Sequence, residues 1–250
     1  MRRRFFVERF DSQSATLRGD GAEHLGRVLR AELGQQYELS DGERVWLARI
    51  ERVSLPKRGE PAIEFALVEP IEAREASLQV QLFISLIKFD RFEWCVEKAT
   101  ELGASEIVPL SAARTDKPLL AAAAKRLERW KRIALESAQQ ARRLRAPVIG
   151  TPVRPGEAFA QCAASHKILL SERGDAASLR AAVSSCALAK RASASLALAI
   201  GPEGGWTDEE IAAARAHGFV EASLGENILR TETAVIAGLA ILQFVLRDQA

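Results

Sequence analysis

The sequence predicts an α/β protein with a small β-rich N-terminal domain and a larger domain of alternating strands and helices. First, short strand-like segments separated by turn residues occupy the chain up to about residue 75. Second, after residue 77, apolar segments of strand length alternate with longer segments of helical period. Third, 250 residues that are 48% hydrophobic are enough for two cores. The polar segment 69–77 marks the boundary, so we expect domains over residues 1–73 and 74–250.

Turn signals organise the N-terminal part. Asp41-Gly42 is typical of a hairpin between two strands, and Asp20 is expected to cap a short helix that carries Arg27 and Arg30. Strands are expected over residues 4–10, 36–40, 45–53 and 62–68. Several strands and one helix in so short a segment indicate a small β-barrel.

The longer C-terminal part has the rhythm of a parallel sheet. Strands are expected over residues 78–87, 106–110, 167–170 and 195–200. Helices are expected over residues 90–101, 119–143, 176–189, 207–216 and 231–246. Strands that alternate with helices predict a mostly parallel sheet with helices on both faces.

Charge is balanced overall but unevenly distributed. The net charge is +2, yet residues 111–150 hold ten Lys or Arg against three Asp or Glu, ending in Arg142, Arg143 and Arg145. Such a segment is a candidate phosphate-binding surface. The alternative is a solvated helix face, and charge alone does not decide between them.

The three cysteines do not form a recognisable site. Cys95, Cys162 and Cys186 are far apart, without a C-x-x-C pair or a histidine at ligand spacing. We therefore expect no disulfide framework and no metal, which fits a reducing cytoplasm. The longest apolar run, residues 234–242, is too short to span a bilayer, so no membrane association is expected.

A glycine-rich loop follows an apolar strand near the C-terminus. The strand 196–200 ends at Gly201-Pro-Glu-Gly-Gly205, after which Thr207 and Glu210 have capping-box spacing. Glycines let the backbone approach a ligand closely, and strand ends of this kind hold ligands in α/β sheets. The segment is neither G-x-G-x-x-G nor a phosphate loop with its lysine. Spacing alone favours a tight structural turn.

A second segment, residues 224–233, reads Leu-Gly-Glu-Asn-Ile-Leu-Arg-Thr-Glu-Thr and leads into the last helix. Thr231 or Thr233 is a possible helix cap. Arg230 needs more explanation, because a cation at a helix N-terminus opposes the helix dipole by ~0.3–1 kcal/mol. We therefore expect a carboxylate or an anionic substrate beside Arg230.

Taken together, these two segments resemble the uridine-N3 methyltransferases of 16S ribosomal RNA in the SPOUT superfamily. Further matching positions are Arg4-Phe5-Phe6, residues 24–30, most of residues 88–102, Arg129-Trp130, Gln140, Arg143 and Pro147. The resemblance covers nearly the whole chain, and its motifs are specific in combination. Two positions depart from the family pattern: Phe89 replaces a usual glycine, and Arg142 replaces a usually small residue.

The resemblance implies a PUA-like β-barrel over residues 1–73 that binds RNA. It also implies a trefoil-knotted SPOUT methyltransferase domain over residues 74–250, although chain connections in general avoid knots. The implied cofactor is S-adenosyl-L-methionine, with S-adenosyl-L-homocysteine as product. The implied partners are 16S rRNA of the small ribosomal subunit and a second copy of the chain in a homodimer, and the implied product is 3-methyluridine in the decoding region.

The resemblance also implies site residues. The cofactor-binding set is Leu170, Ile200, Gly201, Gly205, Leu224, Gly225, Leu229 and Thr231. Arg230 is the expected catalytic cation, which holds the charge of the deprotonated uracil, while Glu203 or Glu232 orients Arg230 or relays the proton. The expected RNA-binding set is Arg4, Arg27, Arg30, Arg142, Arg143 and Arg145.

Three other functions are compatible with the same residues. The chain could be a knotted methyltransferase that acts on transfer RNA or on ribose oxygens. It could also be a non-catalytic RNA-binding or assembly factor with the same fold. An unrelated α/β enzyme with Cys95, Cys162 or Cys186 as nucleophile ranks last, because none of them has a nearby histidine or follows a glycine turn.

Overall fold

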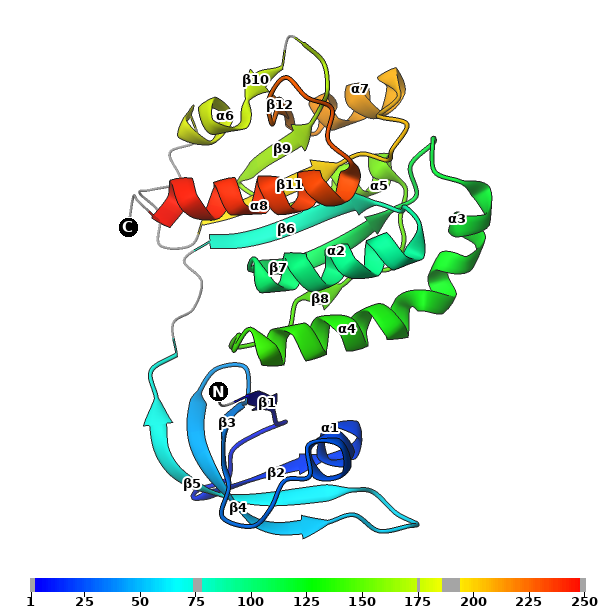
Figure 1. Cartoon of the computed structure of the whole chain (residues 1–250). Helices are drawn as coiled ribbons and strands as arrows, with labels where there is room; N and C mark the ends of the chain where they lie inside the picture. Colours follow the sequence, from blue (N-terminus) through cyan, green and yellow to red (C-terminus); the bar gives the residue numbers. More distant parts are fainter. Residues whose placement is uncertain (1–2, 74–77, 175, 186–193, 248–250) are drawn as a thin grey trace. The chain divides into compact units, whose positions relative to one another are not determined.

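The computed structural model describes residues 3–73, 78–174, 176–185 and 194–247 (Figure 1). The chain forms two compact units. Unit 1 comprises Met1–Glu75 and Ala138–Ala146, and unit 2 comprises Ala76–Ser137 and Pro147–Ala250. The inclusion of Ala138–Ala146 in unit 1 was not expected from the sequence. The expected boundary after residue 73 adjoins residues 74–77, which lie outside the described part.

Unit 1 is built on a five-stranded sheet with strand order β1-β3-β4-β5-β2. Its strands are β1 Arg4–Phe6, β2 Ser14–Arg18, β3 Gln36–Ser40, β4 Val45–Ser54 and β5 Ala62–Ile71. β1 runs parallel to β3, while the other neighbours are antiparallel. The expected hairpin joins β3 to β4, where Asp41 Oδ1 accepts the backbone N–H groups of Glu43 and Arg44. The side chains of Phe5, Leu39 and Phe65 fill the core.

Three expectations for unit 1 were wrong in detail. The first strand ends at Phe6 rather than at residue 10, and β2 had not been expected. The helix α1 Gly19–Glu23 continues as a turn of π-helix, η1 His24–Val28. Arg18 occupies its N-cap position and Asp20 lies in the first turn, so Asp20 supports the helix dipole instead of capping the helix.

Unit 2 contains a seven-stranded sheet with strand order β10-β12-β9-β11-β6-β7-β8. Its strands are β6 Leu78–Ser85, β7 Ala104–Leu110, β8 Val148–Ile149, β9 His166–Leu170, β10 Ala177–Ser178, β11 Ala194–Ile200 and β12 Val220–Ser223. Every pairing between these strands is parallel, in line with the expected parallel sheet. The carboxyl ends of the central strands therefore lie at one edge, where the loops after β9, β11 and β12 emerge.

Helices cover both faces of this sheet, as the alternating pattern predicted. They are α2 Phe89–Glu101, α3 Lys117–Ala123, α4 Leu127–Gln140, α5 Pro155–Gln161, α6 Leu179–Ser185, α7 Asp208–Ala216 and α8 Thr231–Arg247. Leu82 of β6 faces a core that includes Phe92 of α2 and Val235 of α8, while its neighbour Phe83 faces Phe159 of α5. Figure 1 shows α8 running alongside α2, with which it packs.

The long helix expected over residues 119–143 is in fact divided. A turn of 3-10 helix, η2 Ala124–Arg126, separates α3 from α4, and α4 ends at Gln140. Arg142 then has a φ of 51°, a left-handed conformation that ends helices. Of the helix expected over residues 176–189, the structure describes β10 and α6 up to residue 185. β8, β10, β12 and α5 were not expected from the sequence.

The last helix, α8, begins at Thr231 as expected, and Val235, Leu239 and Leu242 are buried on it. Phe244 is 70% exposed despite its apolar ring. No helix in the described part of the chain is both long enough and apolar enough to cross a membrane.

Candidate functional site

A pocket lies at the carboxyl ends of β9, β11 and β12 in unit 2. The structure places the whole expected cofactor-binding set in its lining: Leu170, Ile200, Gly201, Gly205, Leu224, Gly225, Leu229 and Thr231. The glycine loop and the segment before α8 thus form a single pocket. Four more lining residues come from the two segments singled out in the sequence: Pro202, Glu226, Asn227 and Ile228. The lining also contains residues that sequence reasoning missed: Ser171, Glu172, Arg173, Trp206, Ile211, Ser223 and Ala234.

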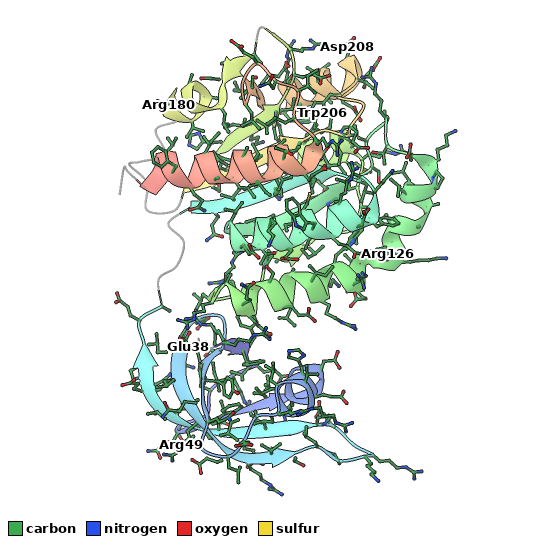
Figure 2. All side chains as sticks on the ribbon, in the orientation of Figure 1. Glu38, Arg49, Arg126, Arg180, Trp206 and Asp208 are labelled. Atoms are coloured by element: carbon green, nitrogen blue, oxygen red, sulfur yellow. The ribbon has the colours of Figure 1, made fainter. Side chains whose placement is uncertain are left out.

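Trp206 fixes the glycine loop from inside unit 2 (Figure 2). Its Nε1 donates a hydrogen bond of 2.9 Å to the carbonyl oxygen of Leu170, which ends β9. Its ring lies so close to Gly201 that a Cβ atom there would be 3.0 Å from the indole. A side chain at position 201 would therefore need the indole or the loop to shift, and the loop after β11 is attached to the end of β9 by the hydrogen bond of Trp206.

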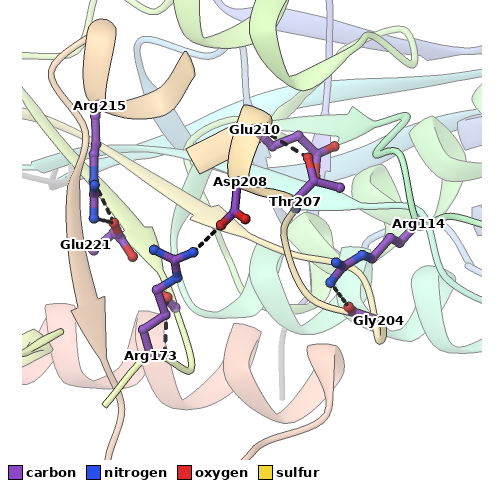
Figure 3. A network of polar contacts seen from close by, with 9 residues as sticks. Arg114, Arg173, Gly204, Thr207, Asp208, Glu210, Arg215 and Glu221 are labelled. Atoms are coloured by element: carbon purple, nitrogen blue, oxygen red, sulfur yellow. Dashed lines mark hydrogen bonds and ion pairs between the residues drawn. The ribbon is translucent and has the colours of Figure 1, made fainter. Parts of the chain in front are cut away.

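The far end of the glycine loop is held just as closely. Gly205 has a φ of 72°, which favours glycine, and its amide donates to the carbonyl oxygen of Pro202 over 2.8 Å. Arg114 Nη1 donates to the carbonyl oxygen of Gly204 over 2.7 Å (Figure 3). The loop has a fixed backbone whose groups line the pocket.

The helix after the loop starts with the capping box that the sequence predicted. The N–H of Glu210 donates to Thr207 Oγ1, and Glu210 Oε2 accepts the N–H of Thr207. Glu210 Oε1 also accepts the N–H of Ala113, so this carboxylate connects the loop after β7 to α7. Beside it, Arg173 of the pocket lining forms an ion pair with Asp208 (Figure 3).

Thr231 connects the two halves of the pocket. It is 4% exposed, and its hydroxyl donates to the carbonyl oxygen of Gly201 over 3.1 Å. Because α8 begins at Thr231, the N-cap position falls on Arg230, so neither Thr231 nor Thr233 is the capping residue. Thr231 uses its side chain to hold the start of α8 against the glycine loop.

Arg230 lies between two pocket-lining residues and is exposed. Within the described part of the chain it has no hydrogen bond or ion pair from its side chain, so the expected carboxylate partner is not found. Glu203 and Glu232 instead contact Arg91, whose Nη1 is 2.7 Å from Glu203 Oε1 and 3.7 Å from Glu232 Oε1. Neither carboxylate contacts Arg230 among the described residues, so the expectation that one of them orients Arg230 or relays the proton stays a prediction.

Arg91, in the first turn of α2, is the site residue that sequence reasoning missed. It lies within the segment 88–102 that had been singled out, and it opposes a helix dipole just as Arg230 does. The same sequence feature, a cation at a helix N-terminus, therefore marks both arginines.

Burial disfavours the described cysteines as nucleophiles. Cys95 and Cys162 are buried. Desolvation, and then the charge of Glu232, raise the pKa of Cys95 to about 12. Desolvation also raises the pKa of Cys162. Because the thiolate is the reactive form, neither residue is activated. Cys186 lies outside the described residues.

The arginines expected to bind RNA have different surroundings. Arg27, Arg30, Arg142 and Arg145 are exposed, whereas Arg143 is partly buried and burial lowers its pKa. Arg4 is 8% exposed and donates to Glu38 Oε2 and to the carbonyl oxygen of Arg142. Its guanidinium is occupied inside unit 1, so its assignment as an RNA contact was wrong.

The residues that line the pocket are suited to binding a small organic ligand. Within the described ranges, no group of three or more His, Cys, Asp or Glu side chains is arranged to hold a metal ion. The lining combines apolar side chains with backbone groups and a few polar side chains, as ligand sites commonly do.

Residues 74–243 match the sequence model of a family described as an RNA methyltransferase domain. With the α/β fold and the pocket, this match defines the protein as an α/β RNA methyltransferase. Ribosomal RNA small subunit methyltransferase E of Synechocystis sp. is 35% identical over 245 residues, which cover 96% of this chain and 76% of that protein. Its namesake in Bacillus subtilis is 30% identical over 258 residues and 96% of each chain. The chain belongs to the family of ribosomal RNA small subunit methyltransferase E.

A solved structure agrees with this assignment. The ribosomal RNA small subunit methyltransferase E from Neisseria gonorrhoeae, crystallised with S-adenosyl methionine, superposes with a TM-score of 0.82. It is 28% identical in sequence, and the match covers 98% of both chains.

Proposed function

We propose that this protein transfers the methyl group of S-adenosylmethionine to N-3 of a uridine in the decoding region of 16S rRNA. The products are 3-methyluridine in the small ribosomal subunit, S-adenosylhomocysteine and a proton. The observation that carries the proposal is the pocket whose lining includes residues from both segments, 200–202 and 205 of the glycine loop and 224–229 and 231 before and at the start of α8. It is supported by the family and by the cofactor bound in the related structure from Neisseria gonorrhoeae.

The pocket has the properties that this cofactor requires. Leu170, Leu224 and Leu229 offer apolar contacts, and the backbone at Gly201 and Gly205 is approachable because neither residue has a Cβ atom. Polar side chains for the ligand's hydrogen-bonding groups are present among the lining residues Glu172, Glu226 and Asn227. Once bound, the cofactor supplies an electrophilic methyl group on a sulfonium.

We assign Arg230 as the catalytic cation. Methylation at N-3 requires loss of the imide proton, and N-3 lies on the Watson–Crick edge, so the uracil must be unpaired or flipped out. Arg230 stabilises the negative charge that the ring then carries. A guanidinium stays protonated and cannot accept the proton, which therefore leaves to solvent. Glu203 and Glu232 are proposed to act on Arg230 indirectly, since both contact Arg91.

The function is tested by comparing 16S rRNA from cells with and without the gene. Mass spectrometry of mapped fragments should show 3-methyluridine only when the gene is present. If the methyl group is found on a transfer RNA or on a ribose oxygen, that position and not N-3 of the uridine is the target. Failure of the purified protein to bind S-adenosylmethionine in calorimetry would favour a non-catalytic RNA-binding factor.

The role of Arg230 has its own test. Arg230→Ala should bind S-adenosylmethionine like the wild type, because Arg230 does not belong to the pocket lining. Its rate of rRNA methylation should fall by about 100-fold or more, as expected for loss of a donor that stabilises developing charge. A fully active variant would remove Arg230 from the mechanism.

We also propose that Arg27, Arg30, Arg142, Arg143 and Arg145 contact the phosphates of 16S rRNA. The exposure of four of these side chains supports the proposal. Neutralising Arg142, Arg143 and Arg145 together should weaken RNA binding and flatten its dependence on salt. If the salt dependence of RNA binding is unchanged, these three arginines form a solvated helix end and do not contact the RNA.

The domain assignments of the resemblance are proposed as well: a PUA-like barrel over residues 1–73 and a trefoil-knotted SPOUT domain over residues 74–250. The five-stranded sheet with β1 parallel to β3 supports the first. For the knot, the support is the path of the chain from β12, which pairs with β9, through the pocket-lining segment 224–229 to α8, which packs against β11 and α2.

We further propose a cytoplasmic homodimer. Ile228 before α8 and Phe244 within it are 79% and 70% exposed, and a second copy of the chain would remove these side chains from water. Sedimentation should give twice the mass of the chain. Replacing Phe244 by Ser should shift the sedimenting species towards the mass of a single chain. A wild-type protein that sediments as a single chain would contradict the proposed dimer.

A further inference from the structure

Arg91 lies between two carboxylates that belong to different segments of the site. Its Nη1 is 2.7 Å from Glu203 Oε1 on the glycine loop and 3.7 Å from Glu232 Oε1 in the first turn of α8. The side chain of Arg91 is 31% exposed, and that of Glu232 is 15% exposed. One cation from α2 thus contacts both segments that form the pocket.

The two carboxylates belong to the two segments that form the pocket. Glu203 lies in the glycine loop, and Glu232 lies in the first turn of α8. Glu232 follows Arg230 by two residues, and the hydrogen bond from Thr231 to Gly201 holds the start of α8 against the loop that carries Glu203. Within the described residues, Glu203 and Glu232 pair with Arg91, and Arg230 forms no ion pair.

We propose that Arg91 is a positioning residue that neutralises Glu203 and Glu232 and thereby keeps Arg230 available for the anionic uracil. This inference rests on the proposed function. A cation already paired with a carboxylate of the protein offers less net positive charge to an anionic substrate than an unpaired cation does. Arg91 therefore acts through Arg230 and need not touch the RNA or the cofactor.

The geometry separates this role from cofactor binding. Neither Arg91 nor Glu203 belongs to the pocket lining. Loss of Arg91 would release the carboxylate of Glu203, whose side chain is 48% exposed, and we expect it to be the one that moves towards Arg230. Glu232 has less freedom, because its Oε2 is buried without a hydrogen-bond partner among the described groups. Neutralising Glu203 should therefore relieve the loss of Arg91.

The test measures S-adenosylmethionine-dependent methylation of small ribosomal subunits by the full-length protein. Arg91→Ala should lower kcat by about tenfold, which corresponds to ~1.4 kcal/mol in the barrier. Arg91→Lys, which keeps the charge, should lose less. Arg91→Ala combined with Glu203→Gln should regain most of the lost activity. All variants should bind S-adenosylmethionine with an affinity within about twofold of the wild type, a change well below the tenfold that 1.4 kcal/mol gives.

Lys98→Ala is the matched control. Lys98 lies on the same helix and also stands between two carboxylates, 2.7 Å from Glu97 Oε1 and 2.9 Å from Glu101 Oε1, but it does not line the pocket. Its loss should leave kcat and cofactor affinity unchanged. A general effect of removing an ion-paired cation from α2 would appear in this variant too.

The pH profile distinguishes charge from structure. An effective Arg230 favours the deprotonated uracil, so in Arg91→Ala the rise of kcat should move to higher pH, and Glu203→Gln should move it back. The inference is overturned if Arg91→Ala keeps the wild-type kcat and pH profile, or if Glu203→Gln gives no recovery. Should Arg91→Ala fail to fold, Arg91→Gln carries the same expectations. A wild-type protein without methylation activity would instead reject the proposed function.

Discussion

The hydroxyl of Thr231 donates a hydrogen bond of 3.1 Å to the carbonyl oxygen of Gly201, a residue 30 positions earlier in the chain. It joins the first residue of α8 to the first residue of the glycine loop, and Thr231 is only 4% exposed. Both residues line the pocket. The relative placement of the two pocket segments therefore depends on a buried side-chain contact that single substitutions can remove.

Replacing Thr231 by Val keeps the shape of the side chain and removes this hydrogen bond. A buried hydrogen bond contributes about 0.5–1.5 kcal/mol, so the affinity for S-adenosylmethionine should fall by roughly 2- to 13-fold in calorimetry. Thr233→Val is the matched control, because Thr233 lies in the same turn and is exposed. Equal affinities for the two variants would show that the contact does not shape the pocket.

Replacing Gly201 by Ala should disturb the pocket through the packing of the glycine loop on Trp206. The added Cβ would lie 3.0 Å from the indole of Trp206, and moving the indole would strain its hydrogen bond to Leu170. Overpacking of this kind destabilises proteins by about 1–3 kcal/mol, so both the melting temperature and the cofactor affinity should fall. Gly156→Ala, where nothing lies within 4 Å of the added atom, should lower neither. A Gly201→Ala protein with wild-type values would contradict this packing argument.

The two pocket segments were identified by their resemblance to a known family, because glycine spacing alone favours a tight structural turn. The packing of Gly201 on Trp206 and the positive φ of Gly205 appear only in the structure. The direction in which a charged side chain points cannot be read from the sequence either. Glu203 pairs with Arg91, 112 residues away, and no local pattern links the two. Short elements such as β12 Val220–Ser223 also show too little periodicity to be predicted.

The misassignment of Arg4 has a similar cause. Charge and position suggested a phosphate contact, but Glu38, which is 7% exposed, and the carbonyl oxygen of Arg142 already accept its hydrogen bonds. The second partner is 138 residues away in the sequence. Which basic side chains remain accessible is decided by tertiary packing, and composition cannot report it.

Arg4→Ala should therefore act on stability. Among the described residues, it leaves the buried carboxylate of Glu38 with Arg142, at 3.6 Å, as its remaining ion-pair partner. The loss of one partner from a buried pair costs up to about 3–5 kcal/mol, and the remaining contact should reduce this to about 2–3 kcal/mol in urea unfolding. A variant as stable as the wild type would show that the Arg4–Glu38 pair contributes nothing.

Arg27→Ala, in contrast to Arg4→Ala, should affect RNA binding and leave stability almost unchanged. Arg27 is exposed, with an ion pair to Glu23 at 3.5 Å, and exposed pairs contribute at most about 1 kcal/mol. Its stability should stay close to that of the wild type, while the salt slope of rRNA binding should fall by about 1. A fall in stability with an unchanged salt slope would assign Arg27 to the fold of unit 1.

Cys95 predicts how stability depends on alkaline pH. Burial, and then the charge of Glu232, raise its pKa from 9.0 to about 12. Between these values the unfolded thiol loses its proton while the folded thiol keeps it, so the folded state binds more protons. Because stability falls with pH wherever the folded state binds more protons, the free energy of unfolding should decrease as pH rises through this range.

Cys95→Ala should make this pH dependence shallower. Its absolute stability will be lower because a buried side chain is truncated, so the comparison is between slopes of unfolding free energy against pH from urea titrations. Cys162→Ala is the reference variant, since burial raises the pKa of Cys162 without a contribution from Glu232. If the slope with Cys95→Ala equals that of the wild type, the thiol of Cys95 does not titrate differently in the two states.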